Sequence, residues 1–555
     1  MRRILLLAAA LVLAAACSQP ASPGPEKLKI FVTTDIHGHL SYDPDQGQLG
    51  LARLQSYIQD AAEAGYKTIL LDSGDVFSGS ALAQVDRGRF VAEMMGRMGY
   101  RVLTPGNHAF DHNELENNYL YYSEILLKTL REHSPGPVEV TVVNLSYQGA
   151  ELPGTVRRPV LLYDESDIDP EGRRVIVAGV TTPYNAMRSS QRPDLADYDF
   201  GRVPGDGPEA AAATKAGILT ALADRLGDFD RPNDIVIVLS HLGQAERSDQ
   251  PEGRVLSLDL AEVPNVDFVA DGHSHQAQAP QTIGTAVFAN GGCYLQSFLE
   301  ITLEPGRDRM ELKTFEQLAE IQPDPAIEAR LAEFEARHGL DEILFLSPDA
   351  AIFSPEDLRT KSTPLGRLIG RTMREVSGAD LALHGSGAIR AGLPAGPVTA
   401  RRLYDVVPFG DDLVSYRMTG REIFTLFEGF FSDSRRFTQF YGPSLQVRPT
   451  GEGERFQLVE ILDKEGQALD PDREYLVAMN SFMAKSLRRN LAPERRAPAK
   501  NDGALAPALI QRLRETRDLD FDGLRADNVL IVGRPAAVGD PLLDPPLEPA
   551  APLQP

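Results

Sequence analysis

Short polar clusters that combine histidine, aspartate and asparagine recur through the first half of the chain. They are TDIHGH (34–39), DSGD (72–75), GNHAFDH (106–112), LSH (239–241) and DGHSH (271–275). Imidazole and carboxylate groups suit Zn, Mn and Fe, and the clusters offer no thiolate. Two divalent ions about 3.5–4 Å apart can clamp the attacking and leaving oxygens of a phosphoryl transfer. The clusters therefore indicate a metal-dependent hydrolase, in which Asp75, placed after a glycine, is the natural bridging carboxylate.

The clusters follow apolar, β-branched runs of the kind that form buried strands. Such runs occur at 28–38, 67–75, 101–108, 138–146, 173–182, 234–241 and 266–275. Helix-like stretches separate several of them, as at 49–65, where apolar residues recur at helical spacing. This alternation predicts a layered α/β core, and ligands of open α/β sheets bind outside the carboxyl ends of the strands. Residues far apart in sequence are therefore expected to converge on one site.

Some of these histidines have ordinary alternatives. His39 could support a ligand or lie in a solvated loop, and His112 is expected at the surface. We also expect His133 and His338 to be exposed. Any single candidate could be a structural polar residue, or an accident of a surface loop, but the whole set could not.

Length, composition and charge narrow the class of protein. A chain of 555 residues is too long for one core, so at least two domains are expected. Apolar content of 42% and charged content of 24% are ordinary for a globular protein. The net charge of -23 argues against a nucleic-acid partner, although a small basic pocket for a phosphorylated substrate remains compatible with it. No protein partner is implied.

The amino terminus predicts export. MRR is a basic segment, and the thirteen residues ILLLAAALVLAAA are apolar but short for a bilayer span. The LAAAC ending resembles a bacterial lipobox, so we predict lipidation of Cys17 and, with Ser18 following, a place at the outer membrane facing the periplasm. The alternative is ordinary cleavage after Ala16, which would leave a soluble periplasmic protein. Cys293 is the only other cysteine and is expected to be a small buried residue.

The motifs DIHG, GD, GNHAFD, SH and GHSH, in this order, resemble the signature blocks of the calcineurin-like metallophosphoesterases over about residues 28–290. GNHAFD resembles the bacterial 5′-nucleotidase branch, which includes periplasmic UDP-sugar hydrolase and ecto-5′-nucleotidase. The resemblance implies that Asp35, His37 and His275 hold one metal ion and that Asn107, His241 and His273 hold a second, with Asp75 bridging them. The ions could be Zn, Mn, Co or Fe.

The same resemblance assigns the remaining residues of the opening cluster. His108 would lie over the transferred phosphoryl group, where it stabilises charge or protonates the leaving oxygen. Asp111 would orient His108 through a hydrogen bond. The nucleophile would be water or hydroxide held by the metals.

The region from 350 to 535 resembles the carboxy-terminal domain of the same enzymes, through STPLGRLIGRTM (362–373), residues 384–423 and YLVAMNSFMA (475–484). Arg390 matches an arginine that contacts substrate, and Phe409 and Phe482 match two aromatics that stack on the base. The alternatives are an ion-paired surface arginine and two core phenylalanines. Two departures put substrate identity in doubt: Gly385, beside His384, stands where an asparagine is usual, and residues 485–505 replace a Gly-Gly-Asp-Gly-aromatic segment, so that only Asp502 could substitute for its aspartate. Lys361 falls near a family arginine.

The predicted organisation has two folded domains. It comprises a signal peptide with lipobox at 1–17, a tether at 18–27, a metallophosphoesterase domain at 28–325, a linker helix at 326–349, a substrate domain at 350–535 and a Pro-rich tail at 536–555. The fold class is a layered α/β sandwich of two sheets flanked by helices, followed by an α+β domain.

The predicted function is hydrolysis of 5′-nucleotides to nucleoside and phosphate. The enzyme alternatives are a 2′,3′-cyclic-nucleotide phosphodiesterase and a nucleotide-sugar pyrophosphatase, with action on sulfur esters more remote. The non-enzyme alternative is a surface-binding lipoprotein.

Overall fold

A computed structural model describes residues 27–110, 121–164, 172–184, 197–205, 207–244, 253–304, 306–355, 357–432, 437–450, 456–487, 491–516, 519–526 and 528–532. The chain divides into two compact units. Unit 1 comprises 1–78 and 86–333, and unit 2 comprises 79–85 and 334–555. The segment predicted as a linker begins within helix α10 (Pro325–His338).

Unit 1 is built on two six-stranded mixed sheets. The first sheet has the order β14 (Arg309–Thr314), β13 (Ser297–Leu303), β1 (Leu28–Thr33), β2 (Lys67–Asp72), β3 (Tyr100–Leu103) and β4 (Glu139–Val140). The second has the order β11 (Gln278–Ile283), β12 (Ala286–Asn290), β10 (Phe268–Asp271), β9 (Asp234–His241), β7 (Arg174–Thr181) and β6 (Val160–Asp164). The central strands β1, β2 and β3 are parallel to one another, as are β7, β9, β10 and β12.

The core of unit 1 lies between these sheets. One cluster joins side chains of both sheets, including Ile30, Ile69, Val177 and Leu239, all of which are buried. Strands covered on both faces need near-continuous apolar runs, because every side chain meets another layer. This explains why the runs seen in the sequence do not alternate between apolar and polar residues.

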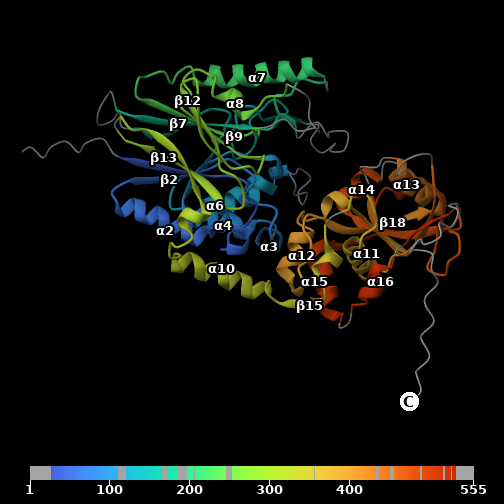
Figure 1. Cartoon of the computed structure of the whole chain (residues 1–555). Coiled ribbons are helices and arrows are strands. Elements are labelled where there is room, and N and C mark those ends of the chain that lie inside the picture. Colours follow the sequence, from blue (N-terminus) through green and yellow to red (C-terminus); the bar gives the residue numbers. More distant parts are fainter. Residues whose placement is uncertain are drawn as a thin grey trace, which may run out of the picture. The chain divides into compact units, whose positions relative to one another are not determined.

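Helices cover the outer faces of both sheets (Figure 1). Those of unit 1 are α2 (Gly50–Glu63), α4 (Arg89–Met98), α6 (Lys128–His133), α7 (Pro208–Leu226), α8 (Ser257–Leu260), α9 (Phe315–Leu318) and α10 as far as residue 333. Helix α7 begins with Pro208 at its first turn and buries Ile218, Leu222 and Leu226 against the second sheet. Each such side chain contributes about 1.5–3 kcal/mol by leaving water. The layered α/β fold predicted from the sequence is confirmed.

The apolar run at 138–146 does not form one continuous strand. It contains β4 and the short β5 (Ser146–Tyr147), which pairs with β8 (Tyr198–Asp199). The reason is that the run passes from one sheet to the other: the amide of Thr141 donates to Leu103 O at 3.0 Å, and that of Val143 donates to Gly179 O at 2.8 Å.

Unit 2 is an α+β fold around a five-stranded sheet. The strand order is β19 (Thr438–Tyr441), β16 (Leu381–Gly385), β22 (Glu474–Asn480), β18 (Asp412–Thr419) and β23 (Lys500–Ala504). Smaller sheets pair β15 (Ile343–Ser347) with β17 (Gly396–Thr399), and β20 (Ser444–Pro449) with β21 (Phe456–Leu462) and β24 (Val529–Ile531). The helices are α3 (Ala81–Gln84), α11 (Pro364–Ser377), α12 (Ala400–Val406), α13 (Gly420–Ser432), α14 (Ser481–Leu487), α15 (Leu505–Glu515) and α16 (Phe521–Arg525).

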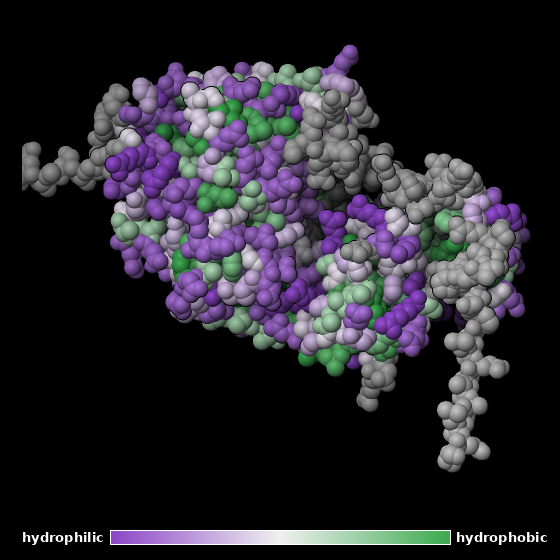
Figure 2. All heavy atoms as spheres, in the orientation of Figure 1, coloured by the Kyte–Doolittle hydropathy of each residue, from purple (hydrophilic) through white to green (hydrophobic). Residues whose placement is uncertain are grey.

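The surface is mostly polar on the face drawn in Figure 2, and its apolar side chains lie in separate groups. Among the described residues, none of the helices is both long enough and apolar enough to cross a bilayer. The predicted signal peptide, Cys17 and tether lie outside the described residues, apart from the last tether residue, Lys27.

Candidate active site

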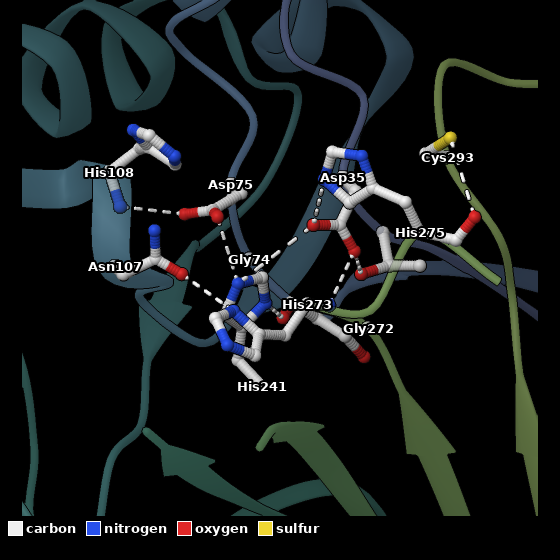
Figure 3. Close-up of polar contacts among 12 residues, drawn as sticks. Asp35, Gly74, Asp75, Asn107, His108, His241, Gly272, His273, His275 and Cys293 are labelled. Atoms are coloured by element: carbon white, nitrogen blue, oxygen red, sulfur yellow. Dashed lines mark hydrogen bonds and ion pairs between the residues drawn. The ribbon is translucent and has the colours of Figure 1, made fainter. Parts of the chain in front are cut away.

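The candidate residues of unit 1 meet at the carboxyl ends of strands from both sheets (Figure 3). Asp35 and His37 follow β1, Asp75 follows β2, and His241 is the last residue of β9. Asn107 and His108 begin a short 3-10 helix (Asn107–Phe110) after β3, and His273 and His275 follow β10. All the predicted metal ligands are thus brought together. Asp111 and His112 lie outside the described residues.

The backbone at this site takes an unusual conformation. Five of the candidate residues have positive φ: Asp35 (47°), His37 (49°), Asp75 (57°), His273 (72°) and His275 (58°). Non-glycine residues seldom adopt this region, and such strain clusters at functional sites. Backbone hydrogen bonds hold the first loops together, since the amide of Asp35 donates to Gly74 O at 2.9 Å and that of His37 donates to Asp75 O at 3.0 Å.

Glycines let these loops approach one another closely. A Cβ added to Gly106 would collide with Asp75 Oδ1, and one added to Gly74 would lie 2.8 Å from His241 Nδ1. No side chain fits at either position without moving a candidate ligand. The glycines in GNH and DSGD are therefore part of the site's geometry.

The two oxygens of Asp35 have different surroundings. Oδ2 accepts hydrogen bonds from Thr34 Oγ1 at 2.7 Å and from the amide of His273 at 2.8 Å. Oδ1 faces three imidazole nitrogens: Nε2 of His275 at 3.2 Å, of His37 at 3.8 Å and of His241 at 3.9 Å. One oxygen is thus held by the protein, and the other faces the centre of the site.

The two oxygens of Asp75 also have different surroundings. Its Oδ1 accepts from the amide of His108 at 2.8 Å, and its Oδ2 lies 2.9 Å from His241 Nε2 and 4.0 Å from His37 Nε2. Because His37 and His241 belong to the two groups of ligands implied by the family resemblance, Asp75 stands between them. This is the place expected of a bridging carboxylate.

Main-chain carbonyls fix the orientation of two imidazoles. Nδ1 of His37 donates to Ser78 O at 2.8 Å, and Nδ1 of His241 donates to Ser73 O at 2.7 Å. A carbonyl can only accept, so these bonds place the proton on Nδ1 and leave Nε2 as a ligand atom in the neutral ring. His37 Nε2 lies only 3.2 Å from His275 Nε2, a spacing that suits two nitrogen donors facing one cation.

The donor atoms form overlapping groups suited to a metal ion. Within each group they lie within 4.8 Å of one another, and the groups are Asp35/His37/His275, Asp75/His241/His273 and His37/Asp75/His108. Asn107 Oδ1 is 2.7 Å from His273 Nδ1, which adds an amide oxygen beside the second group. Without His108, the predicted ligands are two carboxylates, four imidazoles and one amide oxygen, a set that fits divalent transition metals.

The electrostatics of the site favour an added cation. Burial lowers the pKa of His37 to about 4. Burial would also lower the pKa of His241, but the carboxylates of Asp75 and Asp35 raise it to about 10. The pKa of Asp75 is held well below its ordinary value, against the effect of burial, by His241 and His108. A divalent ion would stabilise the negative charge of these buried carboxylates, and it favours the deprotonated form of its ligands.

His108 lies at the edge of the cluster. Its ring centroid is 5.2 Å from that of His37, and it is partly exposed. It could therefore reach a group bound over the ligands.

Tyr294 and Thr34 belong to the site, although sequence reasoning did not single them out. The Tyr294 ring lies against three histidine rings, with centroid distances of 4.3 Å to His39, 5.3 Å to His275 and 5.8 Å to His37. Its φ is 56°, and its amide donates to Asp35 O at 2.9 Å. No sequence motif marks Tyr294, because it reaches the site only where the chain returns after β12. His39, left open between two interpretations, thus packs beside the site.

The predicted substrate residues of unit 2 lie at its surface. Phe409 is 36% exposed and Phe482 is 48% exposed, so neither belongs to the core. The Arg390 guanidinium carbon lies 5.7 Å from the centroid of the Phe409 ring. Lys361 pairs with Asp357 at 2.7 Å, and Asp502 pairs with Lys500 at 2.7 Å.

His384 and Cys293 are buried. Burial lowers the pKa of His384 to about 4 and raises that of the Cys293 thiol to about 12. The burial expected for Cys293 from the sequence is confirmed.

The fold and the candidate ligands are those expected of a metallophosphoesterase, and comparisons with known proteins support this class. The sequence profile of calcineurin-like phosphoesterases matches residues 28–200, and that of the 5′-nucleotidase C-terminal domain matches residues 346–489. The chain belongs to the 5′-nucleotidase family of metallophosphoesterases, as the motifs predicted. Members of this family are hydrolases that act on phosphoesters, which also speaks against the non-enzymatic alternative.

Individual relatives are distant. Trifunctional nucleotide phosphoesterase protein YfkN of Bacillus subtilis is 26% identical over 506 residues, which cover 84% of this chain and 32% of that protein. Protein UshA of Yersinia enterocolitica is 25% identical over 509 residues, covering 82% of this chain and 85% of UshA. The crystal structure of a 5′-nucleotidase precursor from Thermus thermophilus shares the fold, with a TM-score of 0.58, 21% identity and coverage of 92% and 100% of the two chains.

Proposed function

We propose that the protein is an exported phosphoesterase that hydrolyses 5′-nucleotides to nucleosides and phosphate with two divalent metal ions. The observation that carries this proposal is the position of Asp75, whose Oδ2 lies near Nε2 of both His37 and His241 at the centre of the candidate ligands. The exposed pair Phe409 and Phe482, in a unit whose sequence matches the 5′-nucleotidase C-terminal domain, supports a nucleoside as the leaving group.

Asp35, His37 and His275 would hold one ion, and Asn107, His241 and His273 the other, with Asp75 shared. When bound, the ions supply positive charge that polarises the phosphoryl group and acidifies water. Hydrogen bonds within the protein orient these side chains. Thr34 and the amide of His273 hold Asp35 Oδ2, so that Oδ1 faces inward, and carbonyls fix the tautomers of His37 and His241.

His108 would act on the substrate and not on a metal. Its amide is anchored to Asp75 Oδ1, which ties the position of this residue to the ligand set. A cationic imidazole there would stabilise the charge on the phosphoryl group or give its proton to the leaving oxygen. Asp111 would support that protonated form.

Arg390, Phe409 and Phe482 would hold the nucleoside. Stacking between aromatic rings is worth about 1–3 kcal/mol per base and accepts any base, so it provides affinity without choosing among nucleotides. Lipidation of Cys17 would place the enzyme at the outer membrane, facing the periplasm. The support for this is the apolar segment that ends in LAAAC.

The test is phosphate release by purified protein that lacks residues 1–17. The substrates are AMP, UDP-glucose, 2′,3′-cyclic AMP and an aryl phosphate, each with added Mn or with EDTA, and His108→Ala is the control. EDTA-sensitive cleavage of AMP that collapses in the variant supports the proposal. Cleavage of the aryl phosphate alone would refute the nucleotide assignment and retain the metal site.

A wider substrate range is the second candidate. Residues 485–505 replace the segment that supplies a ribose-binding aspartate in the resembled family, and YfkN is named a trifunctional nucleotide phosphoesterase. Cleavage of 2′,3′-cyclic AMP or UDP-glucose with higher kcat/KM than AMP would favour this alternative.

A further inference from the structure

Asp411 joins three consecutive residues at the turn from β22 into α14. Its Oδ2 accepts from Asn480 Nδ2 at 2.7 Å, and its Oδ1 accepts from Ser481 Oγ at 2.9 Å and from the amide of Phe482 at 3.0 Å. Ser481 Oγ also accepts from the amide of Asp412 at 3.1 Å. The partly buried carboxylate therefore fastens the start of α14 to the start of β18.

A carboxylate suits this position because it accepts hydrogen bonds at both oxygens and donates none. One of the three bonds comes from the main-chain amide of Phe482, and the other two come from the side chains of Asn480 and Ser481, so this group holds both the backbone and the side chains of the turn. The main chain of Asp411 is held as well, since its carbonyl accepts from the amide of Leu505 at 2.7 Å.

The residues fastened in this way carry the two exposed aromatic rings. Phe409 lies two residues before Asp411, across Gly410, whose φ of 59° turns the chain, and Phe482 donates its own amide to the carboxylate. The two rings are 36% and 48% exposed, so neither is held by full burial in the core. Asp411 accepts from the amide of Phe482 and stands two residues after Phe409, so it links the segments that carry the two rings.

We propose that Asp411 is a positioning residue that sets the spacing of Phe409 and Phe482 for a flat nucleobase. The inference rests on the proposed nucleotide function. It assigns the selectivity for nucleosides over small leaving groups to a partly buried link and not only to the rings themselves. A purely structural role would instead weaken the whole unit and affect every substrate alike.

The experiment compares kcat and KM for AMP and for an aryl phosphate in the enzyme lacking residues 1–17. Asp411→Ala removes all three bonds and should raise the ratio of KM for AMP to KM for the aryl phosphate by about tenfold, the loss expected when one base stack is disordered. Asp411→Asn should recover most of that loss. Its oxygen can still accept from Ser481 and Phe482, and Asn480 can rotate so that its Oδ1, which has no hydrogen-bond partner among the described residues, accepts from the new amide.

Two further variants guard against a folding artefact. Ser481→Ala deletes one donor to Asp411 and should raise the same ratio by a smaller factor. Asp380→Asn is the matched control, because Asp380 Oδ2 also accepts from a β22 amide, that of Leu476 at 2.8 Å, but at the opposite end of the strand. It should leave the ratio unchanged.

The outcomes separate the two proposals. A parent enzyme that cleaves AMP, with equal KM changes for both substrates in Asp411→Ala and Ser481→Ala, would overturn the positioning role alone. A parent enzyme that cleaves the aryl phosphate but not AMP would overturn the nucleotide function and the positioning role with it.

Discussion

Asp75 Oδ2 lies 2.9 Å from His241 Nε2, and both side chains are buried where the carboxyl ends of β2 and β9 meet. The two residues come from different sheets, so this contact joins the layers at the candidate site. The raised pKa of His241, about 10, and the depressed pKa of Asp75 show that each group stabilises the charge of the other. A divalent ion would replace the proton that gives His241 its positive charge.

Asp75→Asn should therefore remove bound metal and activity together. The amide has no charge to attract an ion, so we expect metal affinity to fall by more than about 100-fold, with loss of phosphate release. Elemental analysis of metal per chain, measured beside activity, checks this. Asp199→Asn is the control, because Asp199 is an exposed carboxylate of the same unit that accepts from the amide of Gly201. Full metal content in Asp75→Asn would refute the bridging assignment.

His108→Ala should separate catalysis from metal binding. The amide of His108 donates to Asp75 Oδ1, and the variant keeps that backbone hydrogen bond, so it should retain its metal. Loss of the imidazole should lower kcat by about 10²–10⁴-fold. Loss of metal in this variant would instead make His108 a ligand, as its grouping with His37 and Asp75 allows.

The convergence of the candidate ligands could be predicted from the sequence because they occupy one topological position. Asp35, Asp75 and His241 each stand at or just after the end of an apolar run, and parallel strands bring such ends to one edge. Thr34 and Tyr294 could not be found in this way. Thr34 has the ordinary appearance of a strand residue, and Tyr294 reaches the site only because the chain returns past β12. The link between Asp411 and Phe482 was hidden for a similar reason, since it joins segments about 70 residues apart.

Thr34→Val should weaken metal binding without unfolding the protein. The valine has almost the same shape, but among the described residues it leaves Asp35 Oδ2 with the amide of His273 as its one remaining donor, so the carboxylate can turn away from the other candidate ligands. Loss of such a supporting bond typically costs 10–100-fold in metal affinity, which a Mn titration of the EDTA-treated protein would measure. Thr302→Val is matched in burial and in facing a carboxylate, that of Glu300. An equal effect of both variants would contradict a specific role for Thr34.

Asp72→Asn should change how stability depends on pH. Burial raises the pKa of Asp72 from 3.8 to about 8, against hydrogen bonds from Thr33 Oγ1 at 2.7 Å and from the amide of Gly74 at 2.7 Å. Between these two values the folded chain holds a proton that the unfolded chain has released. The free energy of unfolding therefore falls as the pH rises through this window.

Asparagine mimics the protonated acid, because it keeps an oxygen for the Gly74 amide and offers an NH2 group to the Thr33 hydroxyl. Urea unfolding of EDTA-treated protein should show the variant more stable than the parent at about pH 8, by on the order of 2 kcal/mol, and nearly equal to it at about pH 4. Asp199→Asn should follow the parent at both pH values. A constant difference between Asp72→Asn and the parent across the range would mean that Asp72 is ionised in the fold, and that the loop before Asp75 is held by a charge instead of a neutral acid.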